Sequence, residues 1–234
     1  MKKHIPLSRI AKKALEKKYD LTVKDIGEDA VFSKKGVTFN TQVCCIGDIG
    51  QICFIQVKAM LGFLKMETVV LSVSGKDIPL FNMDWVSAFG KETLICELYD
   101  VQLSPFSDEI QKRLCDIIKR DEDIPDTEQD EQWYDNILYP CSYHKSSKHA
   151  TSRFNDAAIE YIKQMVNEMH RLDECEKDAK HEKIRSFAGN LYNEGSPVLD
   201  IVKEFFGEEC AKRLLIGHMY GCMDMLEEET ENQP

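Results

Sequence analysis

No segment of this 234-residue sequence is apolar over the roughly 20 residues that a membrane-spanning helix needs. The basic N-terminus, MKKHIPLSRIAKKALEKKYD, lacks the apolar core of a signal peptide, so we expect no secretion. The nine cysteines include no C-x-x-C pair, which argues against a zinc ribbon or a thioredoxin motif and suits a reducing compartment. We therefore predict a soluble, cytoplasmic protein without a membrane span.

The sequence also lacks the common short motifs of catalysis and nucleotide binding. It contains no P-loop, G-x-G-x-x-G, H-E-x-x-H, G-x-S-x-G or EF-hand loop. His144 and His149 are close in sequence, but no cysteine or carboxylate stands between them, so we predict no metal site. The net charge of −11 argues against nucleic-acid binding, which requires a basic face.

Charge is distributed unevenly along what we interpret as a single domain, residues 1–234. Residues 1–20 predict a basic, amphipathic N-terminal helix over 7–19. Residues 121–136 form an acidic segment that predicts an exposed loop, and residues 227–234 form an acidic tail. The basic segment suits either an acidic partner or membrane surface, or simply the solvated face of a helix.

Between Asp29 and Val101 the sequence alternates as strands do. Six short β-rich runs are separated by turns that contain glycine or aspartate, and no segment of crossover length separates them. This pattern predicts an antiparallel meander. Its last two runs, from Ile78 to Pro105, are joined at Gly90 and predict a hairpin; residues 136–144 predict one further strand.

After Pro105 the apolar period becomes helical. Helices are predicted over residues 107–119, 153–172, 180–193, 196–206 and 208–226. A sheet followed by a block of helices indicates the α+β class.

One residue, Asp100, and one segment, from His144 to Arg153, are candidate functional sites. In the strand that follows Gly90, alternation places Asp100 on the same face as Leu94, Cys96 and Leu98, where a carboxyl must be paired or protonated unless it lies at the strand end in solvent. The segment from His144 to Arg153 combines cations, serines and a helix start, which suits either an anion site or an ordinary helix start with surface cations.

Several runs resemble the ferredoxin-dependent bilin reductases, which reduce biliverdin to phycobilins and related linear tetrapyrroles. The run from Pro79 to Asp84, with the later Asp100-Val101-Gln102, is similar to the family's "PxFG-x-D" run and a strand that ends in aspartate. Asn193-Glu194 and the run from Phe206 to Ala211 are similar to its C-terminal pattern. Cys141 to Lys145 resembles the strand that ends in a propionate-binding basic residue.

This resemblance implies a central antiparallel sheet between helices, an α/β/α sandwich that holds the tetrapyrrole between the sheet and the C-terminal helices. It implies no bound metal or flavin, and electrons that arrive singly from ferredoxin or flavodoxin. Asp100 would be the principal proton donor and Glu67 a second acid. The implied substrate-binding residues are His144, Lys145, Lys148 and Asn193.

The chain departs from the family at two positions on earlier strands. The family's histidine and glutamate fall near Glu67–Thr68 and Ile55–Gln56, and neither residue type is reproduced. A non-catalytic tetrapyrrole-binding protein of the same fold therefore stays open as an alternative. A third alternative is an interaction module that uses the basic N-terminal helix and the acidic loop.

Overall fold

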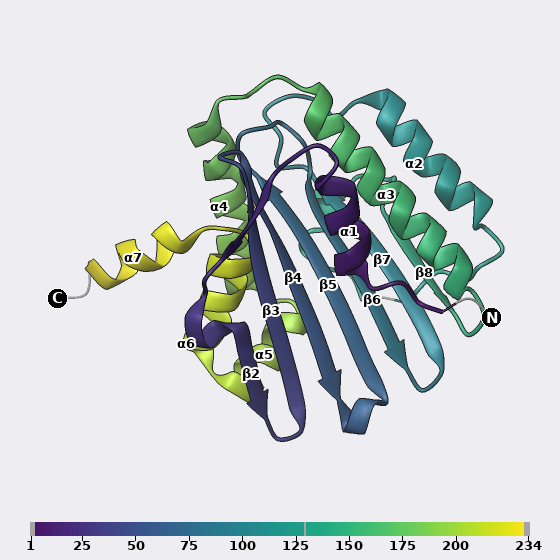
Figure 1. Cartoon of the computed structure of the whole chain (residues 1–234), viewed down its shortest axis with the longest axis horizontal. Coiled ribbons are helices and arrows are strands. Elements are labelled where there is room, and N and C mark those ends of the chain that lie inside the picture. Colours follow the sequence, from purple (N-terminus) through teal and green to yellow (C-terminus); the bar gives the residue numbers. More distant parts are fainter. Residues whose placement is uncertain (1–2, 129, 232–234) are drawn as a thin grey trace.

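One antiparallel sheet forms the centre of the protein, seen in a computed structural model that describes residues 3–128 and 130–231 (Figure 1). The strands of this described part run in the order β1-β3-β4-β5-β6-β7-β8, with β2 paired to β3. They are β1 (Leu21–Lys24), β2 (Val31–Lys34), β3 (Val37–Ile46), β4 (Gly50–Ala59), β5 (Leu64–Val73), β6 (Leu80–Ala88), β7 (Lys91–Tyr99) and β8 (Tyr143–Ser147). The predicted meander and the hairpin of β6 and β7 are confirmed. Strand β1 was not predicted, and β8 begins at Tyr143, well after the expected start of the last strand.

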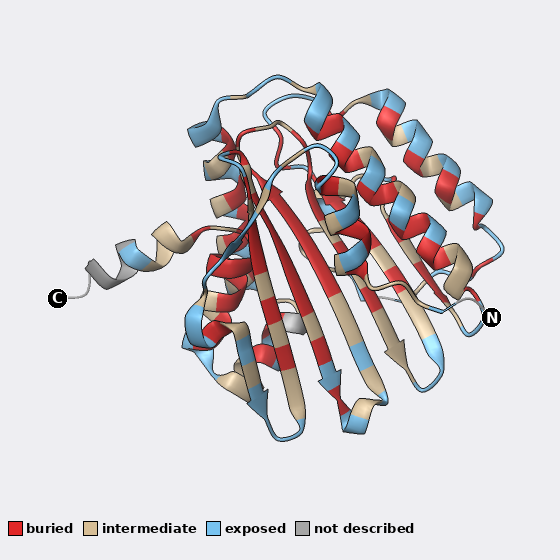
Figure 2. Ribbon diagram, in the orientation of Figure 1, coloured by how far each residue is buried: buried red, intermediate tan, exposed pale blue. Residues whose placement is uncertain are grey.

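Helices cover both faces of this sheet, which confirms the predicted sandwich of three layers (Figure 1). Helices α1 (Leu7–Leu15), α2 (Asp108–Arg120) and α3 (Thr151–Arg171) bury their apolar faces on one side. Helices α4 (Lys177–Glu194), α5 (Pro197–Phe206) and α6 (Glu208–Lys212) lie with the following segment on the other side. The central strands are therefore buried on both faces along most of their length (Figure 2).

The last predicted helix, over residues 208–226, is interrupted. It begins as α6, widens into a π-helical segment, η4 (Arg213–Met219), and turns at Gly221 before α7 (Met223–Glu231). Gly221 has φ +80°, and a Cβ there would lie 3.1 Å from the Gln51 side chain. A glycine is required where the backbone both turns left-handed and approaches a neighbour so closely. The extra backbone width of a π-helix is often found at functional sites.

The charged segments differ from the predictions in part. The acidic segment 121–136 is not an exposed loop throughout, because Asp121 is fully buried. The Tyr143 hydroxyl donates to the Asp121 carboxylate at 2.9 Å, and Arg153 donates to both Asp121 and Asp123. Arg153 therefore anchors the start of the acidic segment to α3. These hydrogen bonds, with those from Arg120, outweigh the burial of the carboxyl and lower the pKa of Asp121.

The chain ends also differ from the predicted bounds. The N-terminal helix ends at Leu15, earlier than predicted. The first residues of the acidic tail belong to α7, whereas residues 232–234 lie outside the described part. Within the described residues, no helix has both the length and the apolar character needed to cross a membrane.

Candidate functional site

A cavity of about 250 Å³ lies between the sheet and the chain from the end of α4 to Tyr220. Alternate residues of β3 to β7 form its floor, because side chains two apart on a strand share a face. Tyr134, from the segment between α2 and β8, and residues of α4 and η4 form the rest of its wall. Its aromatic lining residues are Phe39, Tyr99, Tyr134 and Tyr220, and its polar ones include Thr68, Asn82, Asp84, Glu97 and Ser196.

Asp84 places a carboxyl in this cavity, and the pKa of that carboxyl is strongly raised. Its withdrawal from water raises the pKa to about 7, and the nearby Glu97 charge adds to this rise. Hydrogen bonds from Thr68 Oγ1 and from Asn82 Nδ2, the latter 2.8 Å from Oδ2, oppose the rise without cancelling it. A pKa near neutral pH is the range in which a carboxyl is most effective as a general acid.

Glu97 lies beside Asp84 on the neighbouring strand. Asn82 and Glu97 are paired in the β6–β7 ladder, so Asp84 and Glu97 sit diagonally on one face. The Tyr99 hydroxyl donates to Glu97 Oε2 at 2.5 Å, and His144 Nε2 lies 3.3 Å from Glu97 Oε1. Burial, followed by the Glu97 charge, raises the pKa of Tyr99 well above its usual value, so its phenol stays protonated. The cavity therefore carries a connected set of proton donors and acceptors.

Some buried polar atoms at this face have no protein partner. The Asn82 Oδ1 and Thr41 Oγ1 atoms are buried without a hydrogen bond, and Asn82 lines the cavity. A buried acceptor without a partner is destabilising, so its presence at a cavity points to a ligand that donates hydrogen bonds. Aromatic walls, carboxyls and an unpaired acceptor together suit a flat ligand that is rich in N–H groups.

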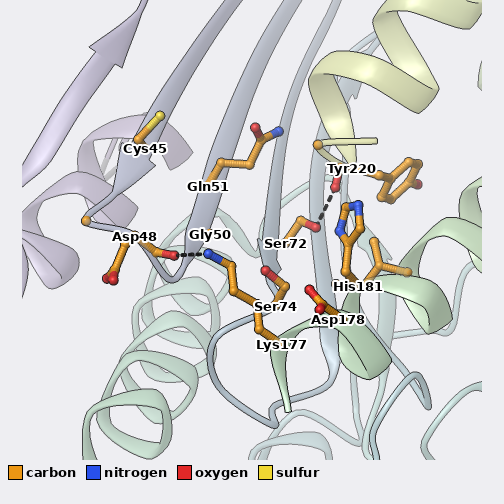
Figure 3. A pocket seen from close by; sticks show the side chains of 13 residues that line it. Cys45, Asp48, Gly50, Gln51, Ser72, Ser74, Lys177, Asp178, His181 and Tyr220 are labelled. Carbon is orange, nitrogen blue, oxygen red and sulfur yellow. Dashed lines mark hydrogen bonds between the residues drawn. The ribbon is translucent and has the colours of Figure 1, made fainter. Parts of the chain in front are cut away.

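A second cavity, of about 320 Å³, adjoins the first and is shown in Figure 3. Tyr220 lines both cavities. Here Lys177 Nζ donates to the Asp48 carbonyl at 2.8 Å, and Ser72 Oγ donates to the Tyr220 carbonyl at 2.7 Å (Figure 3). None of the described residues that line this cavity has a buried side-chain polar atom without a partner. We therefore take the first cavity as the candidate site.

Asp100 lies outside the candidate site. It follows the last residue of β7, is exposed, and accepts a long hydrogen bond of 3.4 Å from the Gln102 N–H. The interpretation that it shares a buried face with Leu98 is wrong, because the strand ends before it. Asp100 instead occupies the alternative position, at the end of the strand in solvent.

Glu67 and Lys145 point to the face of the sheet opposite the cavity. Glu67 Oε2 accepts the Leu7 N–H at 2.6 Å and lies 3.2 Å from His4 Nε2. Burial opposes ionisation of Glu67, but these contacts outweigh it and lower the pKa. Lys145 Nζ is 2.7 Å from the Asp126 carboxylate. Both side chains therefore hold structural segments on the side of α1 and α3.

The other predicted residues are dispersed. His144 is the one that contacts the site, through Glu97. Lys148 is exposed just beyond β8, and Asn193 is exposed near the end of α4. The structure therefore brings none of Lys145, Lys148 and Asn193 into the lining of the cavity.

The sequence carried a signal for the two acids that were not predicted. Asp84 alternates with Asn82 and Val86, and Glu97 alternates with Ile95 and Tyr99. From the sequence, the face of the sheet that carries them is expected to be polar and half-exposed. Alternation alone cannot distinguish a face in contact with solvent from the floor of a covered cavity. In residues 3–128 and 130–231, no group of three or more histidine, cysteine or acidic side chains is arranged to hold a metal ion.

Of the comparisons with known proteins, the one with solved structures identifies the fold. No family model matches the sequence, and no curated protein matches it either. Among solved structures, the chain is similar to phytochromobilin synthase from tomato, a crystal structure in complex with biliverdin, with a TM-score of 0.78 and 12% identity. The match covers 94% of this chain and 83% of that one. The chain therefore has the fold of that synthase, and the fold implied by the sequence resemblance is confirmed.

Proposed function

We propose that the protein binds a linear tetrapyrrole in the cavity between the sheet and η4, and reduces it with Asp84 as a proton donor. The observation that carries this proposal is the carboxyl of Asp84, whose pKa is raised to about 7 inside an aromatic cavity. A solved structure of the same fold holds biliverdin, which supports a bilin as ligand. The unpaired Asn82 oxygen supplies an acceptor for a pyrrole N–H.

Reduction of one double bond of a bilin consumes two electrons and two protons. We propose that ferredoxin or flavodoxin delivers the electrons one at a time, and that Asp84 supplies one proton. Glu97, which accepts a hydrogen bond from Tyr99 and lies close to His144, is placed to take up a proton from solvent and pass it to Asp84 for the second transfer. In this proposal, Asp84 and Glu97 take the proton-transfer roles that the family resemblance implies for Asp100 and Glu67.

The cavity is small for a tetrapyrrole, so binding requires that part of its wall moves outward. At about 250 Å³ it is smaller than the roughly 300–1,000 Å³ of typical ligand sites. Tyr134, which closes one wall, belongs to a connecting segment, and such segments move more readily than the strands below them. No lysine or arginine lines the cavity in the described part of the chain, so bilin propionates would point out of it.

The test is an anaerobic titration of the protein with biliverdin, followed by reduced ferredoxin. A shifted or sharpened absorption band indicates binding, and stepwise loss of that band indicates reduction. Asp84→Asn should keep the binding shift and lower the rate of reduction by about 100-fold or more, the typical contribution of a positioned acid. Asp100→Asn, which changes an exposed carboxyl, is the matched control and should reduce biliverdin as the wild type does.

Each other result has a defined meaning. A binding shift without reduction would favour the non-catalytic binding protein. No spectral change with biliverdin would refute the proposal altogether. Equal rates for wild type and Asp84→Asn would remove Asp84 from the reaction.

A further inference from the structure

Three hairpins turn at one end of the sheet, the lower end in Figure 1. At this end, the β4–β5 and β6–β7 turns present large apolar side chains to solvent: Leu61 is 100% exposed, Phe89 72%, Phe63 65% and Met60 56%. The β5–β6 ladder ends at the pair Leu64–Ala88. Phe63 directly precedes Leu64 and Phe89 directly follows Ala88, so the two phenylalanines lie just beyond the ends of neighbouring strands. We call these four residues the apolar tips.

The backbone of the apolar tips is strained. Met60, Leu61 and Phe89 have φ of 52°, 56° and 50°, the left-handed region that bulky side chains rarely adopt. Glycine or asparagine would satisfy these turns with less strain and without exposing apolar surface. Neither folding nor solubility therefore explains these residue types, and strain combined with an exposed apolar patch indicates a binding function.

Exposed lysines lie in the same hairpins as the apolar tips and in the neighbouring β2–β3 hairpin. The hairpin segments 34–36, 58–65 and 87–91 together contain five lysines and no aspartate or glutamate, in a chain with a net charge of −11. Lys58 and Lys65 face each other across β4 and β5, an unfavourable pair unless an anion lies nearby. The next acid along the chain, Glu92, accepts a hydrogen bond from the Thr151 hydroxyl. These hairpins therefore combine exposed apolar side chains with a local positive charge.

We infer that this end of the sheet docks on an anionic lipid bilayer. The apolar tips enter the boundary between headgroups and acyl chains, and Lys34, Lys35, Lys58, Lys65 and Lys91 contact acidic headgroups. A protein partner fits the composition less well, because protein interfaces favour tyrosine, tryptophan and arginine and are depleted in lysine. Protruding methionine, leucine and phenylalanine with lysines set behind them match a lipid interface.

This docking orients the molecule. The cavity-lining residues nearest the tips are Val57, Met66 and Val86, each three residues from an apolar tip. Three residues of a strand span about 10 Å, so the near end of the cavity stands about 10 Å from the inserted side chains. The inference about docking does not depend on the proposed reaction.

The test is flotation of the full chain with vesicles. One set contains phosphatidylcholine alone, and the other contains about 30% phosphatidylserine, at about 0.1 M and about 0.5 M salt. The wild type should float with the anionic vesicles at low salt and be released at high salt. Leu61→Ser/Phe89→Ser should weaken this binding at least about tenfold, and Lys58→Gln/Lys65→Gln by about thirtyfold. Val23→Ser/Leu103→Ser changes two exposed apolar residues elsewhere and should bind as the wild type does.

Circular dichroism checks the folding of each variant, and we expect all of them to fold because every substituted position is exposed. A wild type that ignores anionic vesicles at low salt, or tip variants that bind as tightly as the wild type, would overturn the inference. Wild-type protein that ignores vesicles but is retained on immobilised ferredoxin, with retention lost in the tip variants, would also overturn it and assign the tips to an acidic protein.

Discussion

Replacing Asp84 by asparagine should make the protein more stable, and the gain should grow with pH. In the unfolded chain this carboxyl has a pKa of 3.8, whereas in the folded protein burial raises it to about 7. Between these two values the folded state holds a proton that the unfolded state has lost, so stability falls as the pH rises. A difference of about three pKa units corresponds to about 4 kcal/mol at pH values above both.

The wild-type penalty is therefore complete only above pH 7. Taking both pKa values, we expect about 2 kcal/mol of it to be present at pH 5.5 and about 4 kcal/mol at pH 8.5. The asparagine side chain of the Asp84→Asn variant is neutral at every pH and still accepts the hydrogen bond from Thr68. It loses the bond that Asn82 donates, which is worth about 1 kcal/mol, unless the Asn82 amide turns and offers its unpaired oxygen.

The assay is urea unfolding of wild type and Asp84→Asn at several pH values from 5.5 to 8.5. The difference in unfolding free energy should increase with pH by about 2 kcal/mol in favour of the variant. Asp100→Asn, at an exposed position, should remain within about 0.5 kcal/mol of the wild type. A constant difference between wild type and Asp84→Asn across this range would refute the raised pKa, and with it the physical basis for Asp84 as a proton donor.

Two further predictions concern buried ion contacts outside the cavity. Lys180→Ala should lower the unfolding free energy by about 3 kcal/mol at pH 7, because it empties a fully buried site and leaves the Ile78 and Val101 carbonyls without their lysine donor. Since burial lowers the pKa of Lys180 to about 8, urea unfolding should show this loss growing between pH 8 and 10; a loss that shrinks with pH would contradict that lowered pKa. Arg213→Ala should lower the unfolding free energy by about 2 kcal/mol, because it removes a two-pronged contact to the buried Asp29. Thermal melts should show that Arg213→Lys recovers only part of this loss, since lysine cannot form both contacts, and full recovery would contradict the role of the guanidinium geometry.

The local patterns that predicted the fold are short-range. Glycines at the turns and alternation in the runs of β3 to β7 identify an antiparallel meander, because hairpin connections are set by neighbouring residues. Strand β8 was misplaced, because its five residues owe their conformation to pairing with β7, whose Cys96 lies opposite Tyr143. The break of the last helix at Gly221 depends on the distant Gln51, a contact that no local pattern contains.

The candidate site likewise has features that local sequence determines and features that depend on the tertiary structure. The sequence by itself determined the class of fold, the hairpin of β6 and β7, and the presence of an acid near its middle and another at its end. Only the tertiary structure decided which acids line the cavity. Asp84 and Glu97 lie under the C-terminal helices, where the loss of water raises the pKa of Asp84, whereas Asp100 emerges into solvent where β7 ends. A pKa depends on everything that surrounds a carboxyl in space, and the surroundings of Asp84 come from strands and helices far apart in the chain.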